Sequence, residues 1–177
     1  GYKGKARWKI NKNEKLELET LKNDYISFQK NLFEYSKLSG QTKDNRTISI
    51  KANIEISSEV KMATKYGAEG IGMYRTEFLF TSKEHFPSLE DQYDDYSELF
   101  KGNLFDEVTI RTLDIGGDKI QDYTHIENNP ALGLRGIRYS LANMNIFETQ
   151  LNAIFKVINK KKKKIRILLP MISNLDE

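Results

Sequence analysis

Four short apolar segments, separated by stretches of helical character, dominate the sequence from residue 47 onward. They read TISIKANI, GIGMYRTEFLF, EVTIRTLDIGG and KIRILLPMI, and they begin at residues 47, 70, 107 and 164. Their β-branched and large apolar residues are typical of buried strands, and the segments between them favour helix. Strand alternating with helix four times predicts an α/β fold with one parallel sheet.

Upstream, residues 14–38 predict one long helix that carries a narrow apolar stripe. Asn13 is expected to cap its start, and Gly40 follows its end. Apolar residues recur in steps of three and four, at Leu18, Leu21, Tyr25, Phe28, Leu32 and Tyr35. The stripe fits either a helix packed against its own domain or a coiled-coil seam, and the short run of heptads favours the first.

Composition excludes several classes of function. The chain has 177 residues, and its 28 Lys and Arg against 25 Asp and Glu give a net charge of only +3. Nucleic-acid-binding domains usually carry a larger basic excess, so we expect no nucleic-acid partner. The absence of cysteine removes disulfides and thiolate metal sites. No apolar run approaches the roughly 20 residues that span a bilayer, so we expect no membrane insertion and a cytoplasmic location.

Charged residues stand at the ends of the predicted strands. Arg75 closes the second strand, whereas Arg111 and Asp114 interrupt the third just before a glycine pair. In parallel α/β folds the carboxyl ends of the strands form the rim where ligands bind. Two guanidinium groups there would converge on one phosphate or carboxylate. Alternatively, Arg75 pairs with Glu77 and Arg111 with Asp114, and the spacing alone does not decide between these interpretations.

Other polar residues give weaker signals. Arg135 and Arg138 follow in NPALGLRGIR, where flanking glycines would allow an arginine to lean over the same rim, although a surface loop fits equally well. His85 and His125 are isolated, so no metal site is predicted from them. The lysine run 160–164 fits a solvated helix C-terminus, where cations complement the helix dipole.

Four motifs in a fixed order make the pattern specific. GAEGIGMYRTEFLF, IRTLDIGGDK, ENNPALGLRGIR and LPMIS together resemble the barrel of the phosphoenolpyruvate-protein phosphotransferases, enzyme I of the bacterial sugar phosphotransferase system. The resemblance implies that residues 45–177 form the first half, about four βα units, of a TIM-type (β/α)8 barrel that binds phosphoenolpyruvate. Residues 13–44 would form the preceding linker helix, and residues 1–12 resemble the tail of a phosphohistidine domain.

The resemblance also implies roles for individual residues. Arg75, Arg111 and Arg135 match the arginines that hold the phosphate and carboxylate of phosphoenolpyruvate in that family. Asp114 matches an acidic residue that helps to order the arginines. The implied reaction moves the phosphoryl group to a histidine of the enzyme and then to the carrier protein HPr. Preorganised cations would stabilise the charge that spreads over the transferring phosphoryl group.

Several parts of the family's machinery have no counterpart in this sequence. By the resemblance, the Mg2+ ligands and a cysteine acid belong to the second half of the barrel, and the phosphorylated histidine belongs to the N-terminal domain that meets HPr. We therefore expect no catalytic residue and no metal ligand in this chain. We also expect that the chain is inactive alone and that the full-length protein is a homodimer.

Two alternatives remain open at the level of sequence. Pyruvate phosphate dikinase and phosphoenolpyruvate synthase share the barrel, so the chain could be a piece of such a relative. It could also be a non-catalytic remnant that acts through its long helix as an association module.

Overall fold

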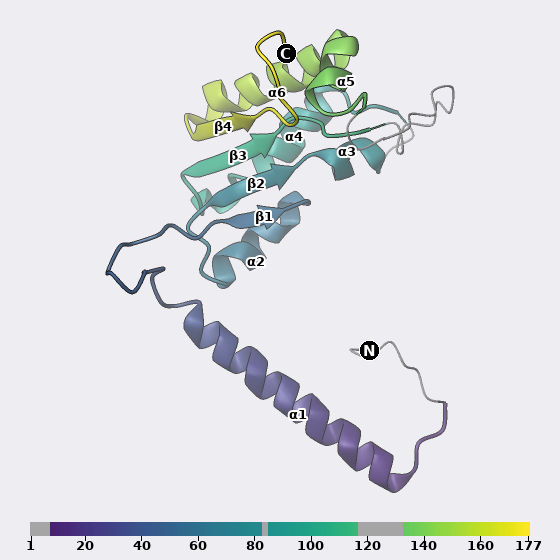
Figure 1. Ribbon diagram of the computed structural model, residues 1–177, viewed down its shortest axis with the longest axis vertical. Helices are drawn as coiled ribbons and strands as arrows, with labels where there is room; N and C mark the ends of the chain where they lie inside the picture. The colour runs from purple at the N-terminus through teal and green to yellow at the C-terminus, as the bar shows by residue number, and fades with distance from the viewer. Residues whose placement is uncertain (1–7, 83–84, 117–132) are drawn as a thin grey trace. The chain divides into compact units, whose positions relative to one another are not determined.

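The computed structural model describes residues 8–82, 85–116 and 133–177. The chain divides into two compact units, Gly1–Ser39 and Gly40–Glu177. The first unit contains a long helix, and the second contains a parallel sheet with its helices (Figure 1). Residues 1–7 of the predicted phosphohistidine-domain tail lie outside the described residues. So do residues 117–132, which include the end of IRTLDIGGDK, the start of ENNPALGLRGIR, and His125.

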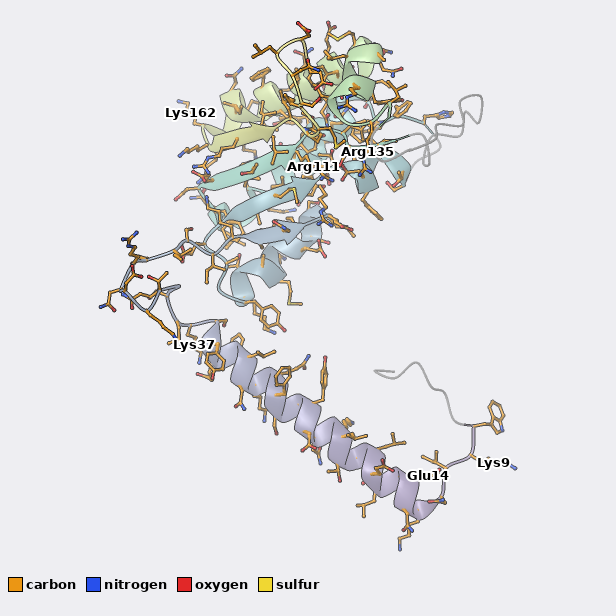
Figure 2. All side chains as sticks on the ribbon, in the orientation of Figure 1. Lys9, Glu14, Lys37, Arg111, Arg135 and Lys162 are labelled. Atoms are coloured by element: carbon orange, nitrogen blue, oxygen red, sulfur yellow. The ribbon has the colours of Figure 1, made fainter. Side chains whose placement is uncertain are left out.

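Helix α1 (Lys12–Tyr35) begins at a reciprocal cap. The Asn11 side chain accepts a hydrogen bond from the Glu14 backbone N–H at 2.9 Å, and the Glu14 carboxylate accepts from the Asn11 N–H at 3.0 Å. The expected cap at Asn13 was wrong, because only Asn11 stands three residues before a glutamate that can reciprocate. Within α1, all of whose residues are described, none is buried, and its apolar side chains stand out from the helix (Figure 2).

The described residues of the second unit form four parallel strands in the order β1-β2-β3-β4. The strands are β1 (Ala52–Ile54), β2 (Ile71–Arg75), β3 (Glu107–Arg111) and β4 (Lys164–Leu168). Between them lie the helices α2 (Val60–Lys65), α3 (Glu77–Thr81), α4 (Leu89–Glu98), α5 (Ile137–Ala142) and α6 (Met144–Lys161). Consecutive parallel strands joined through helices confirm the predicted α/β fold and give the arrangement of a partial (β/α)8 barrel.

Three local expectations need correction. The first strand is shorter than the predicted 47–54, and the second predicted strand segment, 70–80, is strand only to Arg75 and becomes helix α3 at Glu77. Between the third and fourth strands, the predicted helical character belongs to two described helices that meet at Asn143. None of the described helices has the length and apolar character needed to cross a membrane.

Helices α4 and α6 pack together and bury one side of the sheet. In β3, Val108 and Ile110 are buried in this core, while Glu107, Thr109 and Arg111 alternate with them and remain partly exposed. Because successive side chains of a strand point to opposite faces, Arg111 lies on the face away from the helical core. The alternation therefore places a cation at the carboxyl end of β3 without burying it in the core.

Candidate functional site

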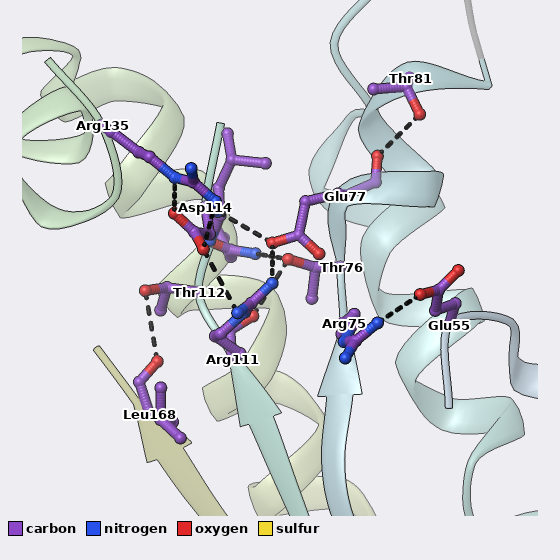
Figure 3. Close-up of polar contacts among 12 residues, drawn as sticks. Glu55, Arg75, Thr76, Glu77, Thr81, Arg111, Thr112, Asp114, Arg135 and Leu168 are labelled. Carbon is purple, nitrogen blue, oxygen red and sulfur yellow. Dashed lines mark hydrogen bonds and ion pairs between the residues drawn. The ribbon is translucent and has the colours of Figure 1, made fainter. Parts of the chain in front are cut away.

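A pocket of about 430 Å3 opens at the carboxyl ends of the strands. Its lining residues come from β1 through the loop before α5: Glu55, Arg75, Glu77, Phe78, Thr81, Arg111, Asp114 and Arg135. The parallel register of β2 and β3 aligns Arg75 directly with Arg111. The three arginines and the aspartate that the sequence singled out thus line one pocket (Figure 3).

Arg111 is held by two carboxylates. Its Nη2 donates to Glu77 Oε1 at 2.9 Å, and its Nη1 lies 3.3 Å from Asp114 Oδ2. The Arg111 side chain is 19% exposed, and those of Glu77 and Asp114 are 14% and 7% exposed. Pairing on both sides offsets the cost of removing these charges from water. Among the described residues, Nε of Arg111 has no hydrogen-bond partner, so the guanidinium retains an unused donor.

Asp114 bridges Arg111 and Arg135. The Arg135 Nε donates to Asp114 Oδ1 at 2.8 Å, and its Nη2 donates to Oδ2 at 3.2 Å. This two-bond fork fixes the plane of the guanidinium as well as its position. Next to Arg135, Gly136 has a φ of +59° and lies close to the segment after β4, because a Cβ there would meet Met171 Cγ at 2.8 Å. Asp114 therefore orders two arginines at once.

Arg75 stands apart from this cluster and is more open. Its Nη1 donates to Glu55 Oε1 at 2.7 Å, and the two side chains are 42% and 57% exposed. The pair that the sequence suggested, Arg75 with Glu77, does not form, because Glu77 bonds to Arg111 and to the Asp114 backbone N–H at 3.0 Å. Water competes well with exposed ion pairs, so Glu55 is a weak partner that an anion could replace.

Among the described residues that line the pocket, the charges balance. Three guanidinium groups face three carboxylates: Arg75, Arg111 and Arg135 against Glu55, Glu77 and Asp114. An anion would therefore be held by preorganised donors and by exchange with Glu55, rather than by a large net positive charge.

Arg138, the fourth arginine of this region, has a different role. It donates to Glu177 Oε1 at 2.7 Å and to Ser173 Oγ at 3.0 Å. The Arg138 guanidinium, helped by the Ser173 backbone N–H, lowers the pKa of the Glu177 carboxyl to about 2. These contacts tie the start of α5 to the segment after β4, and Arg138 is not among the described residues that line the pocket.

Sequence reasoning missed the positions of two carboxylates, Glu55 and Glu77. Glu77 was weighed only as a partner of Arg75, and Glu55 was not considered. Glu55 directly follows β1 and Glu77 lies two residues beyond the end of β2, and this rim position was the available signal. Their partners could not be read locally, because Glu77 and Arg111 are 34 residues apart.

The described residues do not form a metal site. No group of three or more acidic or histidine side chains is gathered for a cation in the ranges 8–82, 85–116 and 133–177. The pocket carboxylates are each engaged by arginine. The described part of the pocket thus presents guanidinium donors, which suit an anion.

Comparison with known proteins gives consistent matches. Residues 29–177 match the family model described as PEP-utilising enzyme, PEP-binding domain. The chain is 39% identical over 175 residues to the phosphoenolpyruvate-protein phosphotransferase of Buchnera aphidicola subsp. Baizongia pistaciae, covering 96% of this chain and 30% of that relative. It is 35% identical over 179 residues to the protein of that name from Mycoplasma pneumoniae, covering 100% of this chain and 31% of the relative. For Latilactobacillus sakei the identity is 40% over 149 residues, covering 81% of this chain and 26% of the relative. The chain spans a little under a third of the length of these curated relatives.

Proposed function

Since the chain belongs to the family of PEP-binding domains of PEP-utilising enzymes, we propose that it supplies part of the phosphoenolpyruvate site of a longer phosphoenolpyruvate-protein phosphotransferase. The observation that carries this proposal is the bridge from Asp114 to both Arg111 and Arg135. It preorganises two guanidinium groups at the strand rim, next to the more open Arg75.

The chemistry of the pocket fits this substrate class. Phosphoenolpyruvate carries a phosphate and a carboxylate on a three-carbon skeleton, and each can accept paired donors from a guanidinium. Arg111 and Arg135 would bind one end, because Asp114 already holds them side by side. Arg75 would exchange its exposed bond to Glu55 for an oxygen of the ligand.

In the proposed reaction, the bond between phosphorus and the enol oxygen breaks while a histidine nitrogen of the enzyme bonds to phosphorus. The enol oxygen keeps the electron pair, and protonation at carbon gives pyruvate. The arginines would stabilise the charge on the phosphoryl oxygens and on the leaving enolate. Because they are already in place, little reorganisation is needed when the charge shifts.

The remaining components of the reaction would come from other parts of the longer protein. These are the Mg2+ ligands, the acid that protonates the enolate and the phosphorylated histidine that serves the carrier HPr. We propose a cytoplasmic, homodimeric enzyme of the sugar phosphotransferase system in which this chain alone is inactive. The relatives named above are phosphotransferases, which favours this reading over a dikinase relative or a non-catalytic remnant.

Calorimetry with phosphoenolpyruvate and Mg2+ tests the proposal. The chain would be titrated alone, mixed with a separately made second half of the barrel, and as that mixture with Arg111→Ala or Arg111→Lys. We expect binding only in the mixture, lost with alanine and strongly weakened with lysine, which lacks the planar fork. Arg166→Ala is the matched control, because Arg166 pairs with Glu107 at the opposite end of the sheet. A folded mixture that binds no phosphoenolpyruvate would refute the proposal and leave Arg111 and Asp114 as a structural ion pair.

A further inference from the structure

A buried amide from α6 reaches behind the pocket and contacts both arginine-bearing strand ends. Gln150 is 1% exposed. Its Oε1 accepts a hydrogen bond from the Leu113 N–H at 3.0 Å, and its Nε2 lies 3.3 Å from Thr76 Oγ1 and 3.1 Å from the Tyr96 hydroxyl oxygen. The Leu113 N–H can only donate, so it sets the orientation of the amide.

The two contacted residues stand between the charged residues of the pocket. Thr76 separates Arg75 from Glu77, and Leu113 lies between Arg111 and Asp114. Thr76 is fully buried, and its hydroxyl donates to the Arg111 carbonyl oxygen at 3.0 Å. Its hydroxyl can therefore accept from Gln150 while it donates to β3. A continuous chain of hydrogen bonds joins the ends of β2 and β3 to α6.

We propose that Gln150 and Thr76 are positioning residues of the anion pocket, setting the separation between the end of β2 and the end of β3. This inference rests on the proposed function. Two neighbouring parallel strands already share ladder bonds, but the ladder ends at the Arg75–Arg111 pair. Beyond that pair, the backbone that carries Glu77 and Asp114 depends on other contacts for its position.

The chemistry of the position supports a role beyond packing. A leucine would fill a similar volume next to this core without the cost of burying an amide. The amide is instead bonded on both sides to the segments that hold the arginines. Small displacements of binding groups weaken binding and catalysis. The separation between the ends of β2 and β3 should therefore affect how well the arginines hold an anion.

Tyr96 provides an internal control. Its hydroxyl lies 3.1 Å from both Gln150 Nε2 and Gln92 Oε1 and is buried in the same core. Tyr96→Phe removes a buried hydrogen bond of Gln150 but leaves both of its bonds to the strand ends in place. It should therefore lower the stability of the fold, as Gln150→Leu does, while leaving the spacing between the ends of β2 and β3 unchanged.

The test uses the complete phosphotransferase that contains this chain, with the variants Gln150→Leu, Thr76→Val, Thr76→Ser and Tyr96→Phe. Calorimetric affinity for phosphoenolpyruvate, KM, kcat and the melting temperature would be measured for each. We expect Gln150→Leu and Thr76→Val to weaken affinity and to lower kcat/KM by up to about 100-fold, the cost of a misplacement near 1 Å. Thr76→Ser, which retains the hydroxyl, should recover most of the affinity. Tyr96→Phe should lower the melting temperature without changing the affinity.

The outcomes separate this inference from the proposed function. If the unaltered protein binds no phosphoenolpyruvate, the proposed function fails and the inference fails with it. If it binds, but Gln150→Leu and Thr76→Val bind as tightly as it does, the positioning role is overturned and the proposed function stands. Equal losses of affinity in these variants and in Tyr96→Phe would also overturn it, because affinity would then follow general stability.

Discussion

Asp114 is a nearly buried carboxylate that lies between two arginines. It is 7% exposed and contacts two guanidinium groups, one of which is a third exposed. Such a carboxylate stabilises the fold because it offsets part of the cost of removing both guanidinium groups from water. Its position also determines where both arginines present their remaining donors. Stability and anion binding are therefore coupled at one residue.

Replacing Asp114 by alanine should destabilise the fold by about 2–3 kcal/mol. This is below the range for breaking a fully buried pair, because Arg135 remains partly hydrated. Urea denaturation followed by circular dichroism would measure the change. Glu98→Ala is the matched control, since Glu98 forms an exposed pair with Lys101 and its loss should cost less than ~0.5 kcal/mol. Equal effects of the two substitutions would contradict the role given to Asp114.

Replacing Glu55 by glutamine should tighten the binding of phosphoenolpyruvate. Glu55 competes with the ligand for Arg75, and removing its charge releases that guanidinium. Because the pair is exposed, we expect a gain of only about two- to fivefold in affinity. Calorimetry at low salt would detect it, with Glu98→Gln as the control. A loss of affinity would instead give Glu55 a direct part in the site.

The strand elements also carry charge at their amino ends, away from the pocket. Glu107 at the start of β3 contacts Lys164 at 2.8 Å, Arg166 at 3.1 Å and Lys51. Hydrogen bonds from Lys164 and Lys51 lower the pKa of the Glu107 carboxyl from 4.5 to about 2. One carboxylate thus links β3 to the adjacent edge strand β4 and to the residue before β1.

This cluster predicts a specific loss of stability in acid. The unfolded chain takes up the proton near pH 4.5 and the folded chain only near pH 2, so between these values the unfolded state binds more protons. The stabilisation from Glu107 is complete above about pH 4.5 and disappears as the pH falls towards 2. Glu107→Gln should therefore lower the melting temperature at pH 7 but have little effect at pH 2. A constant difference between the two proteins from pH 7 to pH 2 would contradict the ion cluster.

At the scale of the second unit, the described sheet has two open edges. Strands β1 and β4 each pair on one side only within the described ranges. At the end of β4 and just after it, the side chains of Leu168, Leu169 and Ile172 are 37%, 38% and 49% exposed. Unpaired strand edges next to apolar side chains favour association with further strands.

We therefore predict that the isolated chain self-associates, and that adding the second half of the barrel gives one defined species. Size-exclusion chromatography with light scattering would follow both samples at micromolar concentration. The physical reason is that the second half would pair with both open edges and cover the apolar residues beside β4. A monodisperse monomer with a cooperative melting transition in the absence of the second half would contradict this prediction.

The sequence alone determined the features that depend on the pattern of neighbouring residues along the chain. The apolar segments and the stretches between them predict alternating strands and helices. Because strands joined in this way run parallel, the carboxyl ends of β2 and β3 lie at the same edge of the sheet, so Arg75 and Arg111 were expected at one rim. Arg135 was a weaker candidate for the same rim and Asp114 a candidate partner of Arg111, and the resemblance then gave a role to both. All four residues line the observed pocket, while their contact with phosphoenolpyruvate stays a prediction.

The tertiary structure decided which groups meet. Arg75 contacts Glu55, 20 residues away, rather than Glu77, because the chain turns into α3 after Thr76 and directs Glu77 towards β3. Gln150 lies 37 residues from Leu113 and 74 from Thr76. No periodicity links residues at such distances, since side chains that far apart meet only after the helices pack on the sheet. Local pattern therefore determined the strand-end arginines, and packing determined the carboxylates and the amide that hold them.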